Sequence, residues 1–219
     1  MDTISRIVTD VPQFHCGGET SWAVNENVLR EIQSHIRPNF STLETGCGAS
    51  TVLFAALGCA HACITPSRDE ADRVLEYAGK LGFATGKLRF LIGSSDDVLP
   101  GLPKDELLDF VLIDGAHRFP YPALDFHYVE QRMKIGSVLV VDDIQIKAVA
   151  MLDEFLKVEE EWKLISLLQN TAFYRKIAEP KRDRDWCDQR LNNLASPVQA
   201  TPLQTRIVAK SRRILGRWR

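Results

Sequence analysis

Two apolar runs in the second half of the sequence each end in acidic residues. Phe110-Val111-Leu112-Ile113 is followed by Asp114-Gly115-Ala116-His117, and Val138-Leu139-Val140-Val141 is followed by Asp142-Asp143. Short β-branched runs of this kind predict strands that are buried on both faces of a parallel sheet. Ligands of open parallel sheets bind beyond the carboxyl ends of the strands. We therefore expect three carboxylates and one imidazole to meet in one crevice.

These side chains suit a site for a divalent cation. Carboxylate ligands with no cysteine among them favour Mg²⁺, Mn²⁺ or Ca²⁺ over zinc. Each acid taken singly is equally well explained as a helix cap. The cluster favours a cation, because like charges at adjacent strand ends repel one another unless a cation or protons compensate them.

A glycine-containing turn, Gly46-Cys47-Gly48, separates a predicted strand that ends at Glu44 from a predicted helix. Glycines at such a turn let the backbone approach a ligand closely. A dinucleotide-binding fingerprint would need a third glycine where Thr51 stands, so the spacing argues against NAD. The alternative interpretation is an ordinary turn between a strand and a helix.

The elements that must position these residues alternate between strand and helix. Apolar residues at helical spacing fill the gaps between the predicted strands, and Asn170-Thr171 separates two final strands that predict a hairpin. This order predicts an α/β fold, a Rossmann-like three-layer sandwich on a mostly parallel seven-stranded sheet with a C-terminal antiparallel hairpin. The predicted strands are 40–44, 61–65, 88–92, 110–113, 138–141, 163–169 and 172–177.

Three motifs together resemble the class I S-adenosylmethionine-dependent methyltransferases: Glu44-Thr-Gly-Cys-Gly, Ile113-Asp-Gly-Ala-His and Val141-Asp-Asp. The similarity covers about residues 20–178 and is greatest to the subgroup that includes metal-dependent sugar O-methyltransferases. The resemblance implies a role for each matching position. The cofactor would contact Glu44, Gly46, Gly48, Ser67, Ser94, Ser95, Asp96 and Asp114, with adenine beside 94–96; the cation would bind Asp114, Asp142 and Asp143; and His117 would be the base.

One position departs from that family's pattern. An acid usually ends the second strand there and binds the ribose hydroxyls, whereas this chain has Thr65-Pro66-Ser67. Asp69 or Glu70 would have to reach in from the following helix, or Ser67 would replace the acid weakly. The departure keeps open a second interpretation, in which the chain is a non-catalytic or weakly cofactor-binding member of the fold that acts as a binding protein.

The resemblance implies an enzyme, an O-methyltransferase that transfers a methyl group to a hydroxyl of a small molecule or glycan. Arg118, Phe119 and Tyr121 follow the expected base, and we expect them to shape the acceptor pocket. An NAD-dependent oxidoreductase is disfavoured by Thr51 and by the lack of a Tyr-x-x-x-Lys pair. A metal-dependent hydrolase would leave the glycine turn without a purpose.

Composition limits the binding partners and the cellular compartment that we expect for the protein. A net charge of −2 argues against general nucleic-acid binding. The five cysteines form no CxxC pair, which favours free thiols in a reducing compartment. The polar N-terminal segment does not read as a signal peptide, and no apolar run is long enough to span a membrane. We therefore expect a cytoplasmic protein.

The compositional break at Glu179-Pro180 predicts two parts: a methyltransferase domain over 1–179 and a basic, partly helical extension over 180–219. Residues 206–219 carry basic groups among apolar ones and no acid. They are interpreted as a solvated helix, as a patch for weak contact with an anionic membrane or a polysaccharide, or as a contact in a homo-oligomer.

Phe14-His15-Cys16-Gly17-Gly18 precedes the first predicted helix. It is either a glycine-hinged lid over the substrate or, as the favoured interpretation, a frayed terminus. Elsewhere, His35, His61 and His127 are expected to be structural.

Overall fold

A computed structural model describes residues 1–19, 24–181 and 185–194. Within it, residues 1–181 form one compact unit and the described residues after 181 belong to a second. The second unit contains two short 3₁₀ turns, Trp186–Asp188 and Arg190–Asn193. The predicted helix over 206–219 lies outside the described residues, and the division of the chain at 179 stays a prediction.

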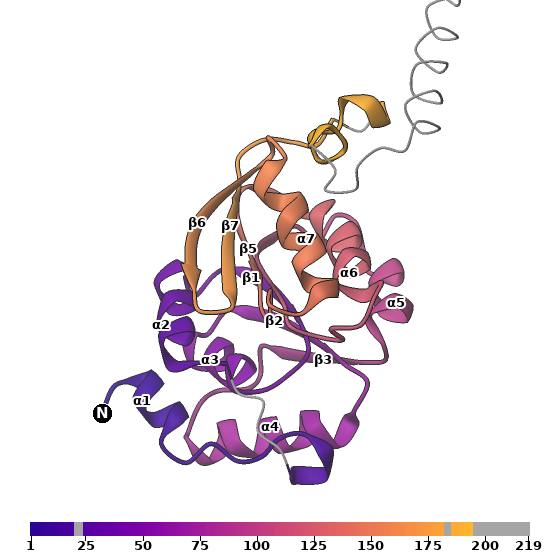
Figure 1. Cartoon of the computed structure of the whole chain (residues 1–219). Coiled ribbons are helices and arrows are strands. Elements are labelled where there is room, and N and C mark those ends of the chain that lie inside the picture. Colours follow the sequence, from indigo (N-terminus) through magenta and orange to yellow (C-terminus); the bar gives the residue numbers. More distant parts are fainter. Residues whose placement is uncertain (20–23, 182–184, 195–219) are drawn as a thin grey trace, which may run out of the picture. The chain divides into compact units, whose positions relative to one another are not determined.

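The first unit is built on a seven-stranded sheet in the order β3-β2-β1-β4-β5-β7-β6. The first five strands are parallel, and β7 pairs antiparallel with β5 and β6. The predicted fold class is therefore confirmed, including the closing hairpin (Figure 1). The strands are β1 Ser41–Thr45, β2 Ala60–Thr65, β3 Leu88–Ile92, β4 Leu108–Ile113, β5 Met133–Val141, β6 Trp162–Leu168 and β7 Thr171–Lys176.

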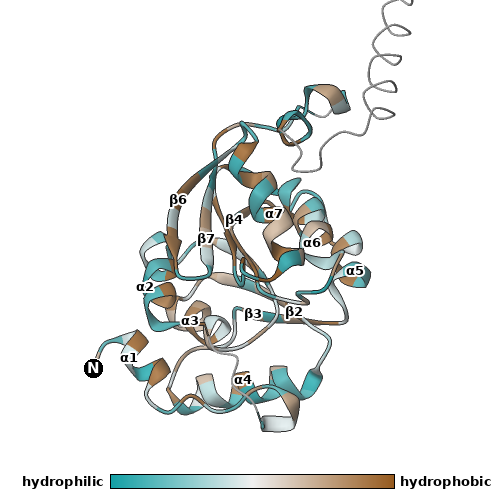
Figure 2. Cartoon of the chain, in the orientation of Figure 1, coloured by the Kyte–Doolittle hydropathy of each residue, from teal (hydrophilic) through white to brown (hydrophobic). Residues whose placement is uncertain are grey.

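Helices cover both faces of this sheet. The apolar core on one face joins the sheet to α1, α2, α3 and α4, and the core on the other face joins it to α6 and α7. Figure 2 shows the amphipathic pattern this requires, with hydrophilic and hydrophobic segments alternating along α4. The helices are α1 Thr3–Val8, α2 Glu26–His35, α3 Ala49–Leu57, α4 Arg68–Lys80, α5 Ser95–Val98, α6 Tyr121–Glu130 and α7 Lys147–Val158.

Strand register brings the expected site residues to one level. Thr45, the last residue of β1, lies opposite Ile113 of β4, and Ile113 lies opposite Val141 of β5. The residues that follow these three strands therefore leave the sheet side by side at its carboxyl edge. Among the helices that the structure describes, none is long and apolar enough to cross a membrane.

The N-terminal segment packs against α4 rather than fraying. The Phe14 ring is buried and meets the Tyr77 ring edge-on, with ring centroids 5.9 Å apart. The Arg73 Nε donates to the Phe14 carbonyl at 2.7 Å, and the Tyr77 hydroxyl donates to the Ile7 carbonyl at 2.8 Å. The interpretation as a frayed terminus is therefore wrong, because long-range packing holds a segment whose local sequence gives no such signal.

Candidate functional site

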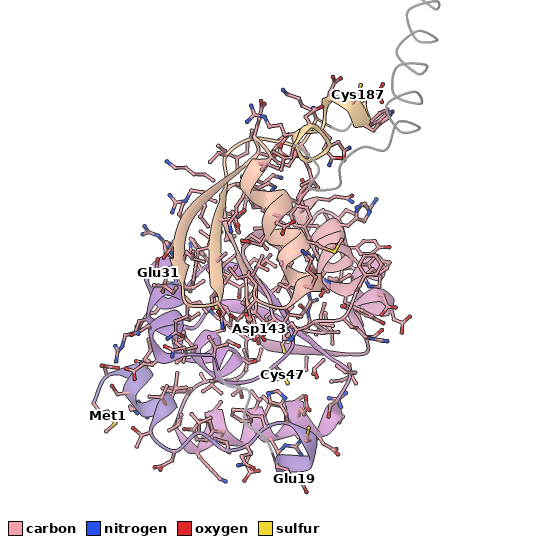
Figure 3. All side chains as sticks on the ribbon, in the orientation of Figure 1. Met1, Glu19, Glu31, Cys47, Asp143 and Cys187 are labelled. Atoms are coloured by element: carbon pink, nitrogen blue, oxygen red, sulfur yellow. The ribbon has the colours of Figure 1, made fainter. Side chains whose placement is uncertain are left out.

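A cavity of about 890 Å³ opens at the carboxyl edge of the parallel strands. Its wall includes the glycine turn after β1, Gly93 and Ser94 after β3, and the acidic segments after β4 and β5. Figure 3 shows two labelled residues of this wall, Cys47 and Asp143, near the middle of the first unit. The two motifs that were adjacent only by inference from the sequence therefore border one cavity.

The turn after β1 depends on Gly46. Its φ of +89° is a left-handed conformation that favours glycine. A Cβ here would overlap the carbonyl oxygen of Asp114, so the first residue after β4 packs directly against the turn. At Gly48 a Cβ would meet only the His15 Nε2, at 3.8 Å, which is ordinary contact. The sequence weighs the two glycines equally, but the structure requires glycine more strongly at Gly46.

Glu44 does not border the cavity, and the expected contact between Glu44 and the cofactor stays a prediction. Its side chain is buried behind the turn. One carboxylate oxygen accepts from the Ser50 hydroxyl at 2.8 Å, and the other accepts from the Thr51 hydroxyl and lies 3.1 Å from the His61 Nε2. Thr51 in turn accepts from the Gly48 amide at 3.0 Å. Glu44 therefore holds the start of α3, and with it the glycine turn.

His61 completes this buried network. Its Nδ1 lies 2.8 Å from the Thr42 hydroxyl, and its ring stacks on Phe54 with centroids 4.1 Å apart. Since the Glu44 carboxylate can only accept, the His61 Nε2 carries the proton that it donates. The structural role expected for His61 is confirmed, because both of its ring nitrogens have buried partners.

Ser67 and Asp96, which were also expected to contact the cofactor, make hydrogen bonds within the protein. Ser67 caps α4, where its hydroxyl accepts from the Glu70 amide at 3.2 Å. Asp96 is held by the Ser94 hydroxyl and lies 3.4 Å from the Tyr121 hydroxyl. Neither borders the cavity, whereas Ser94 and Ser95 do. Ser67 and Asp96 hold the local structure beside the cavity wall, and their direct contacts with the cofactor stay predictions.

Glu70 is the acid that reaches the cavity near the end of β2. It lies one turn into α4 and borders the cavity, as does His15. The Glu70 Oε2 is 3.4 Å from the His15 Nδ1 and accepts from the Cys47 thiol at 3.8 Å. Of Asp69, Glu70 and Ser67, the three residues considered as replacements for the missing strand-end acid, Glu70 borders the cavity.

Acidic residues that follow β4 and β5 lie beside both ring nitrogens of His117. The His117 Nε2 lies 3.4 Å from the Asp114 Oδ1, and the His117 Nδ1 lies 3.5 Å from the Asp143 Oδ2. One ligand atom from each of the three residues lies within 4.8 Å of the others. Asp142 borders the same cavity, but its carboxylate accepts from the Thr171 hydroxyl. The three carboxylates expected to share a cation are therefore together, but the tight group contains His117 in place of Asp142.

Burial and neighbouring charges shift the pKa values of Asp114, Asp142 and His117. Burial raises the pKa of Asp114 to about 7, against the opposing effect of the nearby His117 imidazole. Burial also raises the pKa of Asp142. The Asp114 carboxylate raises the pKa of His117, with smaller contributions from Asp143 and Asp142. The neighbouring carboxylates therefore favour the protonated form of the His117 imidazole.

Of the three residues after His117 that were expected to shape the acceptor pocket, two border the cavity and one is exposed to solvent. Arg118 and Tyr121 border the cavity, with the guanidinium 4.7 Å from the ring centroid and donating to the Tyr121 hydroxyl at 3.1 Å. Phe119 is 68% exposed and is not part of the wall. Arg118 and Tyr121 therefore lie at the cavity and Phe119 does not, and their part in binding an acceptor stays a prediction.

Comparison with known proteins agrees with this architecture. Residues 43–144 match the sequence model of a family described as a methyltransferase domain. No curated protein matches the chain in sequence. Among solved structures, a candidate O-methyltransferase from Klebsiella pneumoniae superposes with a TM-score of 0.67 at 14% identity, covering 81% of this chain and 91% of that one.

Two further structures were described with a bound nucleotide. The O-methyltransferase TomG from Streptomyces achromogenes, in complex with SAM, gives a TM-score of 0.64 at 18% identity and covers 81% of this chain and 91% of its own. An O-methyltransferase from Bacillus cereus, in complex with SAH, gives 0.58 at 18% identity over 71% and 83%. Residues 43–144 thus match a methyltransferase family, and the chain shares the fold of these O-methyltransferase structures. The metal-dependent sugar subgroup stays a prediction.

Proposed function

We propose that this protein binds S-adenosylmethionine and transfers its methyl group to a hydroxyl of a small molecule or glycan. The observation that carries the proposal is that one cavity is bordered both by the glycine turn at Gly46 and by the group Asp114, His117 and Asp143. A methyl donor and a hydroxyl to be deprotonated need such neighbouring subsites, because methyl transfer requires the oxygen in line with the S–CH₃ bond.

His117 has the properties of the base in this reaction. It borders the cavity, and two carboxylates flank its ring nitrogens. An imidazole nitrogen would accept the hydroxyl proton while the oxygen forms its bond to the methyl carbon. The S–CH₃ bond breaks at the same time, and its electron pair returns to sulfur, giving the neutral thioether S-adenosylhomocysteine. The carboxylates stabilise the imidazolium that results.

A divalent cation fits the donor set of this group. Asp114 and Asp143 offer carboxylate oxygens and His117 a ring nitrogen, a mixture that Mn²⁺ and other first-row ions accept more readily than Ca²⁺. A bound cation would lower the pKa of the acceptor hydroxyl. If both His117 nitrogens are engaged by the cation and a carboxylate, His117 cannot also take the proton, so the two proposed roles compete.

Metal titration separates these roles. We expect Mn²⁺ to bind the wild type in calorimetry and to lose about tenfold or more in affinity in Asp143→Asn, because one of three ligands is removed. Asp142→Asn should change the affinity less, since Thr171 already engages that carboxylate. Equal loss in the two variants would favour the three-carboxylate set. An activity that is unaffected by EDTA and by Asp143→Asn would remove the catalytic cation.

Glu70 is proposed to take the place of the ribose-binding acid. A carboxylate can accept from two adjacent hydroxyls, and Glu70 borders the cavity beside the glycine turn. We expect Glu70→Gln to weaken S-adenosylhomocysteine binding by about tenfold, since hydrogen bonds to a charged group are worth about 1.5–3 kcal/mol. Asp69→Asn, one residue earlier on the exposed side of α4, is the matched control and should bind like the wild type. Equal affinities in both variants would refute the role of Glu70.

Activity is tested by supplying S-adenosylmethionine with a labelled methyl group and a panel of sugars and phenols. We expect label in an acceptor and release of S-adenosylhomocysteine that depends on that acceptor. Nucleotide binding without transfer to any acceptor would favour the non-catalytic binding protein instead. The cytoplasmic location, a homo-oligomer and contact between residues 206–219 and anionic membranes also stay predictions.

A further inference from the structure

The N-terminal segment, residues 1–19, lies along α4 and runs from the end of that helix toward its beginning (Figure 1). The partners on the helix fall in number as the segment rises in number. The contacts are Arg6 with Leu81, Ile7 with Tyr77, Phe14 with Arg73 and His15 with Glu70. The last of these contacts lies at the first turn of α4, where His15 borders the cavity.

The position of His15 is fixed from both sides. Before it, Phe14 is buried, and its carbonyl accepts from the Arg73 Nε at 2.7 Å. After it comes a turn in which the His15 carbonyl accepts from the Gly18 amide at 2.9 Å. This turn holds Cys16 at a φ of +49°, a left-handed conformation that is costly for a residue other than glycine. Such a conformation persists only where the surrounding structure fixes it, so His15 is held at the cavity by the fold.

The His15 imidazole stands between two parts of the cavity wall. Its Nδ1 lies 3.4 Å from the Glu70 Oε2, and its Nε2 lies 3.8 Å from the position of a Cβ on Gly48. Only 13% of the His15 side chain and 20% of the Glu70 side chain are exposed. An imidazole and a carboxylate that are shielded from water in this way interact more strongly than they would on the surface.

Two groups lie beside the same oxygen of Glu70. The Cys47 thiol donates to the Glu70 Oε2 at 3.8 Å, and the His15 Nδ1 faces that oxygen as well. Because a carboxylate is planar, contacts at Oε2 restrict its rotation and direct Oε1 away from His15 and Cys47. A glutamate that is already held in this way loses less rotational freedom when it binds a ligand.

We propose that His15 is a positioning residue that fixes the Glu70 carboxylate for the ribose hydroxyls of the nucleotide. The inference rests on the proposed function, because it requires Glu70 to accept hydrogen bonds from those hydroxyls. It adds that nucleotide affinity depends on the packing of the N-terminal segment along α4. Arg73 does not border the cavity, and it acts through Phe14 and His15.

The test compares two ligands by calorimetry on the full chain: S-adenosylhomocysteine and its 2′,3′-dideoxy analogue, which lacks both ribose hydroxyls. We expect His15→Ala to weaken binding of S-adenosylhomocysteine about fivefold, a loss typical of one hydrogen bond. The same variant should bind the dideoxy analogue as the wild type does, because Glu70 has no hydroxyl to receive. His15→Asn keeps an N–H group near the position of Nδ1 and should recover most of the affinity.

A second histidine–glutamate pair supplies the matched control. On α2, the His35 Nε2 lies 3.3 Å from the Glu31 Oε1, and neither residue borders the cavity. His35→Ala removes an imidazole from a similar pair and should bind both ligands as the wild type does.

Arg73→Ala tests whether the packing of the segment places His15. We expect it to weaken S-adenosylhomocysteine binding to about the same extent as His15→Ala. The double variant should bind no more weakly than either single variant, because both changes act through one carboxylate. If Arg73→Ala does not fold, the comparison of the two ligands in His15→Ala still decides.

Several outcomes would overturn the inference. These are wild-type affinity for S-adenosylhomocysteine in His15→Ala or in Arg73→Ala, and an equal loss with both ligands, which a merely structural imidazole predicts. A wild-type protein that binds no S-adenosylhomocysteine refutes the proposed function and the inference together. Normal binding by Glu70→Gln refutes the role of Glu70 and with it the inference, whereas a loss in Glu70→Gln with none in His15→Ala refutes only the inference.

Discussion

Gly46→Ala is expected to abolish measurable binding of S-adenosylhomocysteine. A Cβ at this position overlaps the carbonyl oxygen of Asp114, which is backbone and cannot rotate away. Relief requires the turn after β1 and the segment after β4 to separate, and these border the cavity from two sides. A displacement of about 1 Å at a positioned group is enough to cost on the order of 100-fold. Calorimetric titration of the variant measures the effect.

Gly58→Ala is the matched control for this prediction. Gly58 ends α3 with a φ of +69°, so alanine there suffers the same kind of backbone strain. Nothing lies within 4 Å of its Cβ position. We expect it to lose about 1 kcal/mol of stability and to keep its affinity. If Gly46→Ala bound the nucleotide as Gly58→Ala does, the glycine turn would not be part of the binding site.

His117→Asn is expected to lower the rate of methyl transfer by about 10²–10⁴-fold, which is the usual contribution of a general base. Asparagine keeps polar atoms beside Asp114 and Asp143 but cannot accept a proton near neutral pH. Affinity for S-adenosylhomocysteine should change little, because the proposed base faces the acceptor rather than the cofactor. Single-turnover rates with labelled methyl donor measure the loss.

A second histidine controls for the general effects of removing an imidazole. His35 ends α2 and lies 3.3 Å from Glu31, outside the cavity wall. His35→Asn should react at the wild-type rate. Undiminished transfer by His117→Asn would show that another group, or a cation alone, activates the acceptor. A loss of Mn²⁺ affinity in the same variant, with the rate restored by excess Mn²⁺, would favour His117 as a ligand rather than a base.

The sheet was predictable because its central strands are short apolar runs whose ends are marked by glycine or acid. The run 88–92 has the predicted bounds, and β1, β2 and β4 differ from their predicted bounds by two residues or fewer. The strand β5 begins well before the predicted run, at Met133. Its first part is mostly exposed and carries Lys134 and Gly136, so it lacks the apolar signal of a buried strand.

The position of Glu44 behind the glycine turn has a simple geometric cause. Successive side chains of a strand point to opposite faces, and Glu44 is one residue short of the end of β1. It therefore shares its face with Thr42, toward α3 and His61, while Thr45 faces Asp125 on the other side. The order of residues in a motif does not show which face of the sheet each side chain takes. That follows only when the exact last residue of the strand is known.

The position of His15 was beyond local reasoning, whereas the burial of Asp125 on α6 was not. His15 reaches the cavity because Arg73 and Tyr77 hold the segment before it, and these contacts join parts of the chain far apart in sequence. Asp125 did leave a signal, since it follows Leu124 and precedes Val129 by one helical turn on the apolar side of α6. A charge at such a position indicates either a buried partner or a function.

The most direct test of the account is calorimetric titration of the wild-type protein with S-adenosylhomocysteine at neutral pH. The account predicts saturable binding of one nucleotide per chain, with a matching rise in melting temperature that grows with ligand concentration. The absence of both heat and thermal shift at millimolar ligand would contradict it, whatever the fold resembles.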